Sequence, residues 1–112
     1  AATDPGYAVN PAQIERQVSG SFVYGLSALF EEECTVKNGR IEQTNFDTFG
    51  SIRLKQMPPV ETIIIQGGGK EWGGIGEPTI SVAAPAVLNA FYRATGKRLR
   101  TIPLKNSGIT LV

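Results

Sequence analysis

Residues 81–95 constrain the fold of this chain most, because they predict a helix that is apolar almost all round. Gly96 predicts a left-handed C-terminal cap, with Lys97 and Arg98 beside the last carbonyls. Pro85 fits the first turn of this helix. A domain of roughly 100 residues buries only about two-thirds of its unfolded surface, so the rest of the chain has too little surface to cover such a helix on all sides. We therefore expect a buried helix that other polypeptide helps to cover.

A glycine-rich run, Gly-Gly-Ile-Gly-Glu-Pro, precedes this helix at residues 73–78. Its glycines lack a Cβ, so the backbone can adopt positive φ angles and can approach a bulky ligand closely. Pro78 disfavours helical geometry at Glu77 and so stiffens the setting of this carboxylate. We expect the apolar segments on either side to bury the turn, and a carboxylate held there could act as a general base. The alternative is an ordinary turn with an exposed glutamate.

The first part of the chain predicts a helix that begins after Asn10. Asn10 can serve as the N-cap, Pro11 occupies the first helical position, and Gln13 occupies the capping-box position. Gly20 and Gly25, together with several serines, make this helix thin, which suits close packing against another backbone or a large ligand. Apolar residues recur along it at helical spacing through about residue 30: Ile14, Val18, Phe22, Leu26 and Leu29.

Asn38-Gly39 predicts a two-residue hairpin turn between residues 33–37 and residues 40–44. In this register Val36 lies opposite Ile41 on one face. The alternation on both sides of the turn therefore predicts a β-hairpin.

Two further strands complete the expected order. Residues 60–66 contain three consecutive isoleucines, which indicates a strand buried on both faces. Residues 99–104 predict a second short strand. The order helix, hairpin, strand, buried helix, strand indicates an α+β fold. At this length, residues 1–112 form one unit, and we expect other polypeptide to complete it.

The side-chain inventory excludes several kinds of site. Cys34 is the only cysteine, histidine is absent, and 11 basic against 10 acidic residues give a net charge of +1. The chain therefore offers no internal disulfide, no zinc or iron–sulfur ligand set, and no Ser-His or Cys-His nucleophile. No basic face indicates nucleic acid binding, and no apolar run approaches the about 20 residues of a membrane span. We expect Cys34 to be an ordinary buried residue of the hairpin.

Six short motifs follow one another over nearly the whole chain: Asp4-Pro-Gly, Asn10-Pro11, Gln17-Val-Ser-Gly-Ser-Phe-Val-Tyr-Gly25-Leu, Lys37-Asn-Gly-Arg40, Gly73-Gly-Ile-Gly-Glu-Pro78 and Ala84-Pro-Ala-Val-Leu-Asn-Ala-Phe-Tyr-Arg-Ala-Thr-Gly-Lys-Arg98. In this order the chain resembles the C-terminal part of the molybdenum-cofactor-binding large subunit of the xanthine dehydrogenase/aldehyde oxidase family. The similarity is greatest to the bacterial branch of isoquinoline 1-oxidoreductase-like and aldehyde dehydrogenase large subunits.

The resemblance implies a molybdopterin-type molybdenum cofactor that this chain shares with other polypeptide. Glu77 then corresponds to the glutamate beside the molybdenum, the general base that takes a proton from a hydroxyl on the metal. The backbone of Gly74, Ile75 and Gly76 would contact the pterin or the molybdenum oxygens. Gln17 would hydrogen-bond to the pterin. The alternative interpretation is that Gln17 is a solvated residue of the helix. No side chain of this chain is expected to bind the metal directly.

The resemblance also implies partners and a reaction. The expected reaction is the oxidation of an aldehyde to a carboxylic acid, and the alternatives are hydroxylation of an N-heterocycle of the isoquinoline type or a non-catalytic structural role. A small module whose glycine turn binds a phosphate or a partner is a further alternative. Candidate partners are the rest of the molybdopterin-binding subunit, a [2Fe–2S] subunit and a haem c cytochrome subunit. The expected location is the periplasm or the periplasmic face of the inner membrane, and the alternative is the cytoplasm. Thr79 departs from relatives that carry a proline or glycine there, so the substrate class stays open.

Overall fold

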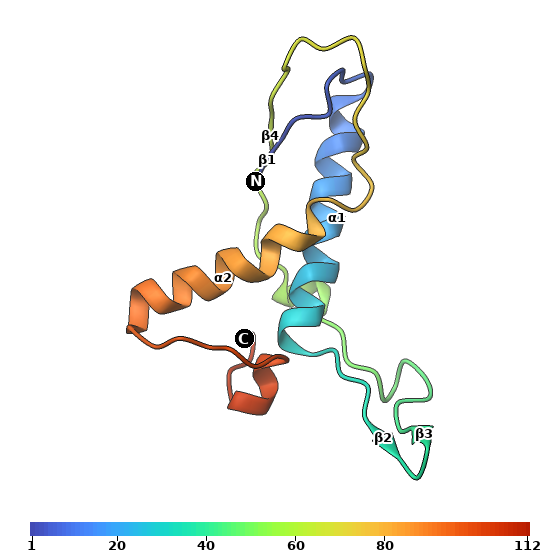
Figure 1. The fold of residues 1–112 in the computed structure, drawn as a ribbon, viewed down its shortest axis with the longest axis vertical. Coiled ribbons are helices and arrows are strands. Elements are labelled where there is room, and N and C mark those ends of the chain that lie inside the picture. Colours follow the sequence, from blue (N-terminus) through green and yellow to red (C-terminus); the bar gives the residue numbers. More distant parts are fainter.

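Helix α1 (Pro11–Phe30) forms the long axis of the computed structural model, which describes residues 1–112 (Figure 1). It begins as predicted, because the backbone N–H of Gln13 donates to the side-chain oxygen of Asn10 at 3.3 Å. The second half of the predicted capping box is missing, since the Gln13 side chain instead accepts a hydrogen bond from Arg16 at 2.9 Å. The predicted apolar face is confirmed by the buried side chains of Ile14, Val18, Leu26 and Leu29.

Helix α2 (Ile80–Thr95) crosses α1 (Figure 1). The two helices approach closely at Gly25, where an added Cβ would lie 2.7 Å from the Cβ of Ala83 and 2.8 Å from the carbonyl oxygen of Ile80. Glycine at this position therefore allows the close helix packing that the small residues of α1 predicted. Gly96 caps α2 in the left-handed conformation, with φ at 71°, as predicted.

The expected cover of α2 by other polypeptide stays a prediction, whereas the expected place of Pro85 in the first turn is wrong. Ala83 is its one buried residue, because only α1 and the C-terminal segment pack against the helix and its other faces are open. Pro85 lies inside the helix rather than in its first turn. A proline there has no N–H to donate to the carbonyl of Ser81, so this hydrogen bond is lost.

The core lies where α1, α2 and the C-terminal segment meet. It consists of Leu26, Leu29, Phe30, Ile52, Ala83 and Leu104. The strand predicted at residues 99–104 is absent, and this irregular segment leads into the 3₁₀ helix η2 (Leu104–Ser107). No strand lies beside it, and Pro103 lacks the N–H that a sheet ladder needs. The segment instead places the buried Leu104 in the core; a second 3₁₀ helix, η1 (Leu54–Gln56), follows Ile52.

The N-terminus pairs with the segment that precedes the glycine loop. β1 (Ala2–Thr3) and β4 (Ile63–Ile64) form a parallel two-stranded sheet. β4 is shorter than the predicted strand at residues 60–66, and its burial on both faces is wrong, since Ile63 is 58% and Ile65 48% exposed. β1 is its only neighbour in the sheet, so these apolar side chains lack cover within this chain.

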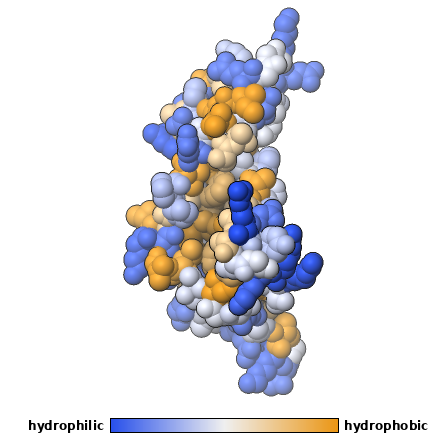
Figure 2. Space-filling model, turned by 90° about the vertical axis from the view of Figure 1, so that its left-hand side faces the viewer, coloured by the Kyte–Doolittle hydropathy of each residue, from blue (hydrophilic) through white to orange (hydrophobic).

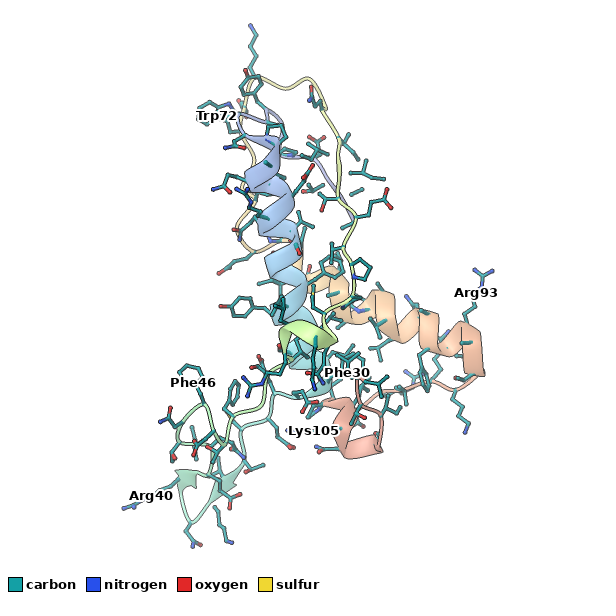
Figure 3. The ribbon with its side chains drawn as sticks, turned by 180° about the vertical axis from the view of Figure 1, so that it is seen from behind. Phe30, Arg40, Phe46, Trp72, Arg93 and Lys105 are labelled. Atoms are coloured by element: carbon teal, nitrogen blue, oxygen red, sulfur yellow. The ribbon has the colours of Figure 1, made fainter.

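The predicted hairpin is confirmed in turn and register. β2 (Val36–Lys37) and β3 (Arg40–Ile41) are antiparallel, with Val36 opposite Ile41. Asn38 and Gly39 have φ angles of 52° and 76°, as a type I′ turn requires. The strands are shorter than predicted, and the hairpin projects from the body with Arg40 near its tip (Figure 3). Cys34 is exposed rather than buried, because residues 31–51 contribute no buried side chain to the core.

The chain as a whole is open and elongated. It measures 52 × 36 × 25 Å, with a radius of gyration of 16.6 Å, whereas a compact domain of this length has about 13 Å. Its accessible surface is 8180 Å², against about 6,000 Å² for a compact protein of this mass. Apolar patches interrupt the polar surface along the face in Figure 2. Neither helix has the length and hydropathy that crossing a bilayer requires.

Candidate functional site

A cavity of about 480 Å³ separates α1 from the turn that leads into α2. This volume lies within the range of about 300–1,000 Å³ that is typical of small-molecule sites. One wall comes from α1 at positions three, four and seven residues apart, which share one helix face. The other wall comes from the end of the glycine run and the start of α2. The lining residues are Gln17, Gly20, Ser21, Tyr24, Gly76, Glu77 and Ile80.

The Gln17 side chain bridges the two walls of this cavity. Its Nε2 donates a hydrogen bond of 2.6 Å to the carbonyl oxygen of Gly76. On the same helix, the hydroxyl of Ser21 donates to the carbonyl oxygen of Gln17 at 2.9 Å. The structure therefore brings the predicted residues Gln17, Gly76 and Glu77 into one site.

The predicted site residues are not all alike in their placement. Glu77 lines the cavity but is exposed, so its expected burial is wrong within this chain: only α1 and the start of α2 face it. Gly74 is exposed and Ile75 is half-buried, and neither lines the cavity. The expected backbone contacts of Gly74 and Ile75 with the cofactor therefore stay predictions.

Four lining residues were not predicted as site residues. Gly20, Ser21 and Tyr24 follow Gln17 by three, four and seven positions, so the helical period counted from Gln17 would have found them. Ile80 offered no such signal, because its position depends on where α2 begins in space.

The start of the glycine run is held by the N-terminal segment. The backbone N–H of Gly73 donates to the carbonyl oxygen of Pro5 at 2.8 Å. Beside this bond, the rings of Tyr7 and Trp72 stack with centroids 6.4 Å apart and planes 15° apart. Trp72 lies at the end of the molecule farthest from the hairpin (Figure 3). The run is therefore anchored at its start by the N-terminus and near its end by Gln17.

Bare backbone on both walls suits a bulky ligand. A Cβ added at Gly20 or Gly76 would meet nothing within 4 Å, so packing within the chain does not require glycine at either position. A glycine inside a helix costs about 1 kcal/mol relative to alanine, so Gly20 carries a cost without a local benefit. An organic group that approaches the helix closely would account for it.

The polar groups at the cavity suit the organic part of a cofactor. No group of three or more His, Cys, Asp or Glu side chains lies close enough to hold a metal ion. Gln17 and Tyr24 can donate hydrogen bonds there, and Glu77 can accept them. Away from this cavity, burial raises the pKa of Glu32, which lies beside a second cavity of about 300 Å³.

The fold and this cavity define a class of protein: an α+β unit in which a helix and a glycine-rich turn present bare backbone to a cavity of small-molecule size. Residues 1–58 match the family model of the molybdopterin cofactor-binding domain, and the chain belongs to this family. The matched residues include Gln17 and the whole of α1, whereas Glu77 and its turn lie beyond them.

Individual relatives agree with this assignment. The chain is 29% identical to the isoquinoline 1-oxidoreductase subunit beta of Brevundimonas diminuta, over 93% of this chain and 13% of that protein. It is 30% identical to the membrane-bound aldehyde dehydrogenase (pyrroloquinoline-quinone) of Gluconacetobacter polyoxogenes, over 95% of this chain and 14% of that protein. The chain thus spans only 13% to 14% of the length of these relatives.

A solved structure shares the fold. The crystal structure of the Cu,Mo-CO dehydrogenase in its carbon monoxide reduced state matches with a TM-score of 0.72 and 23% identity. The match covers 85% of this chain and 13% of that chain. The resemblance found in the sequence and the α+β class are therefore confirmed.

Proposed function

We propose that this chain forms one wall of the cofactor site of a molybdenum-dependent oxidoreductase that oxidises an aldehyde to a carboxylic acid. The observation that carries the proposal is the convergence of Gln17, Gly76 and Glu77 on one cavity. Membership of the molybdopterin cofactor-binding family supports the kind of cofactor. A relative named as an aldehyde dehydrogenase supports the substrate class.

In this proposal Glu77 is the general base. Its side chain lines the cavity and would accept a proton from a group held there. The bare backbone at Gly20 and Gly76 admits the flat organic part of the cofactor, and Tyr24 offers a ring and a hydroxyl beside it. When bound, the molybdenum cofactor supplies the two-electron oxidation of the substrate. The residues of this chain bind and orient the cofactor, and Glu77 removes a proton.

An N-heterocycle is the second candidate substrate. Identity to the isoquinoline 1-oxidoreductase subunit, at 29%, is nearly equal to identity to the aldehyde dehydrogenase, at 30%. Steady-state rates of the native assembly with an aldehyde and with an N-heterocycle separate the two reactions. A structural role of this chain without catalysis predicts that Glu77→Gln leaves the rate of the assembly unchanged.

The proposal requires other polypeptide. With one cysteine and no histidine, this chain has no ligands for an iron–sulfur cluster or a haem, so a [2Fe–2S] subunit and a haem c cytochrome subunit would carry the electrons away. The rest of the molybdopterin-binding subunit would complete the cofactor site and cover α2. A periplasmic location is part of the proposal.

Replacing Glu77 tests the proposed base. In the native assembly we expect Glu77→Gln to lower kcat by about 10²–10⁴-fold, because the change removes the proton acceptor and keeps the volume. Molybdenum content should stay at the wild-type value. Glu71→Gln is the matched control, since Glu71 is exposed in the same loop and does not line the cavity. An unchanged kcat in fully loaded Glu77→Gln enzyme would refute the role.

The mass and metal content of the native particle give an independent test. We expect a particle larger than the 12.0 kDa of this chain, containing both molybdenum and iron. A lone species of 12.0 kDa without molybdenum would contradict the proposal.

A further inference from the structure

We propose that Gln17 is a positioning residue that sets the orientation of Glu77 through the backbone of Gly76. This inference rests on the proposed function of Glu77 as a base. Sequence resemblance assigns the Gln17 amide to the pterin. In the structure, one of its N–H groups is instead engaged with the Gly76 carbonyl oxygen at 2.6 Å. This contact joins positions 59 residues apart in the sequence.

Peptide geometry explains how the contact reaches Glu77. The carbonyl of Gly76 and the nitrogen and Cα of Glu77 lie in one rigid plane, so a held oxygen constrains where the Glu77 side chain begins. The next peptide group is also held, because the backbone N–H of Ile80 donates to the carbonyl oxygen of Glu77 at 3.0 Å. Pro78 restricts Glu77 further. The side-chain torsions of Glu77 are then its main remaining freedom.

Little else holds this part of the turn. An added Cβ at Gly74 or Gly76 would meet nothing within 4 Å, so the turn makes few packing contacts there. The Gln17 amide makes the one side-chain hydrogen bond between α1 and residues 67–79. The backbone of α1 at Gln17 is held in place by packing, since the neighbouring Val18 is completely buried. Glycines give the turn its freedom, and Gln17 removes that freedom beside the carboxylate.

The test uses the full-length enzyme in its native assembly. Gln17→Met keeps the length of the side chain and removes both amide donors. We expect faster amide hydrogen exchange in residues 74–80, which include the Ile80 N–H that bonds to Glu77. We also expect kcat to fall by about 10–10²-fold with KM and molybdenum content unchanged, because a displaced base loses rate without losing binding.

Gln13→Met is the matched control. Gln13 lies one helical turn earlier on α1, and its side chain bonds only to Arg16. This variant should leave the exchange of residues 74–80 and kcat at their wild-type values.

A second variant supplies a pH readout. In Gln17→Glu a protonated carboxyl can still donate to the Gly76 oxygen, whereas the ionised form can only repel it. The activity of this variant relative to wild type should therefore fall as pH rises through the pKa of the new carboxyl. The corresponding ratio for Gln17→Met should not change with pH. Gln17→Glu keeps the length and polarity of the side chain, so the inference can still be tested if Gln17→Met fails to fold.

Two results would overturn the inference. The first is unchanged exchange of residues 74–80 in both variants, together with loss of molybdenum, which would make Gln17 a cofactor ligand. The second is a Gln17→Glu ratio that does not vary with pH. If Glu77→Gln leaves kcat unchanged, the proposed function fails, whereas hydrogen exchange still decides whether Gln17 holds the turn.

Discussion

Gly20 and Gly25 lie on the same helix, but different neighbours account for them. At Gly25 an added methyl group would meet the Cβ of Ala83 and the backbone of Ile80. At Gly20 it would enter the open cavity beside Gln17. Gly25 therefore serves helix packing, and Gly20 leaves room for a ligand.

This difference predicts opposite effects of the same substitution. Gly25→Ala should destabilise the protein by about 1–3 kcal/mol, because α2 must move to admit the methyl group. Gly20→Ala should gain up to about 1 kcal/mol in helix propensity, yet lower the occupancy of the cofactor by filling the cavity. Thermal unfolding and the molybdenum content of the assembled enzyme measure the two effects. Equal melting temperatures and equal loading in the two variants would contradict this division.

The residues of the site could be predicted only in part from the sequence. Resemblance to a family placed Gln17, Gly76 and Glu77 together, and the cavity agrees with that grouping. It did not predict the bond from Gln17 to Gly76, because no pattern along the chain reports a contact across 59 positions. The roles of Gly74 and Ile75 stay predictions that depend on a ligand and on other polypeptide.

At the scale of elements, features set by local chemistry were predictable. The Asn10 cap, the Asn38-Gly39 turn and the Gly96 cap all depend on residues within a few positions of each other. The strand at residues 99–104 and the burial of residues 60–66 depended on partners elsewhere. No second strand lies beside the former, and only β1 lies beside the latter, so both predictions failed.

The close approach of the N-terminal segment to the glycine loop depends on Gly6, the glycine of the Asp4-Pro-Gly motif. Gly6 has a φ of +77°, and a Cβ there would collide with the carbonyl oxygen of Glu71. The hydrogen bond from Gly73 to Pro5 and the stacking of Tyr7 on Trp72 lie beside it. Gly6 therefore lets the N-terminal segment approach the glycine loop.

Gly6→Ala should detach this segment from the loop. Gly68→Ala is the matched control, since Gly68 has a φ of +75° and an added Cβ there meets nothing within 4 Å. Both variants bear the strain of a left-handed alanine, about 1–2 kcal/mol, but only Gly6→Ala adds a backbone collision. We expect faster hydrogen exchange and proteolysis in residues 1–7 and 67–73 for Gly6→Ala than for Gly68→Ala. Indistinguishable rates would mean that the close approach at Gly6 is not needed.

At the scale of the whole molecule, open surface is the dominant feature. The accessible area of 8180 Å² exceeds by roughly a third that of a compact protein of this mass. The uncovered residues include Ile63, Ile65 and most of α2. Monomeric proteins rarely leave such extended apolar surface open. We propose that the remainder of a larger protein packs on this area.

A chain with this little burial should not fold cooperatively alone. Only 14 of its 112 residues are buried, and six of them form the core. The hydrophobic free energy of so small a core cannot offset an ordering cost of about 1–2 kcal/mol for each residue. We therefore expect residues 1–112, produced alone, to bind a hydrophobic dye and to melt without a sharp transition, while the same residues within the full-length protein melt cooperatively. A sharp two-state transition of the monomeric chain would instead show that it folds by itself, and would favour the alternative of a small non-catalytic binding module.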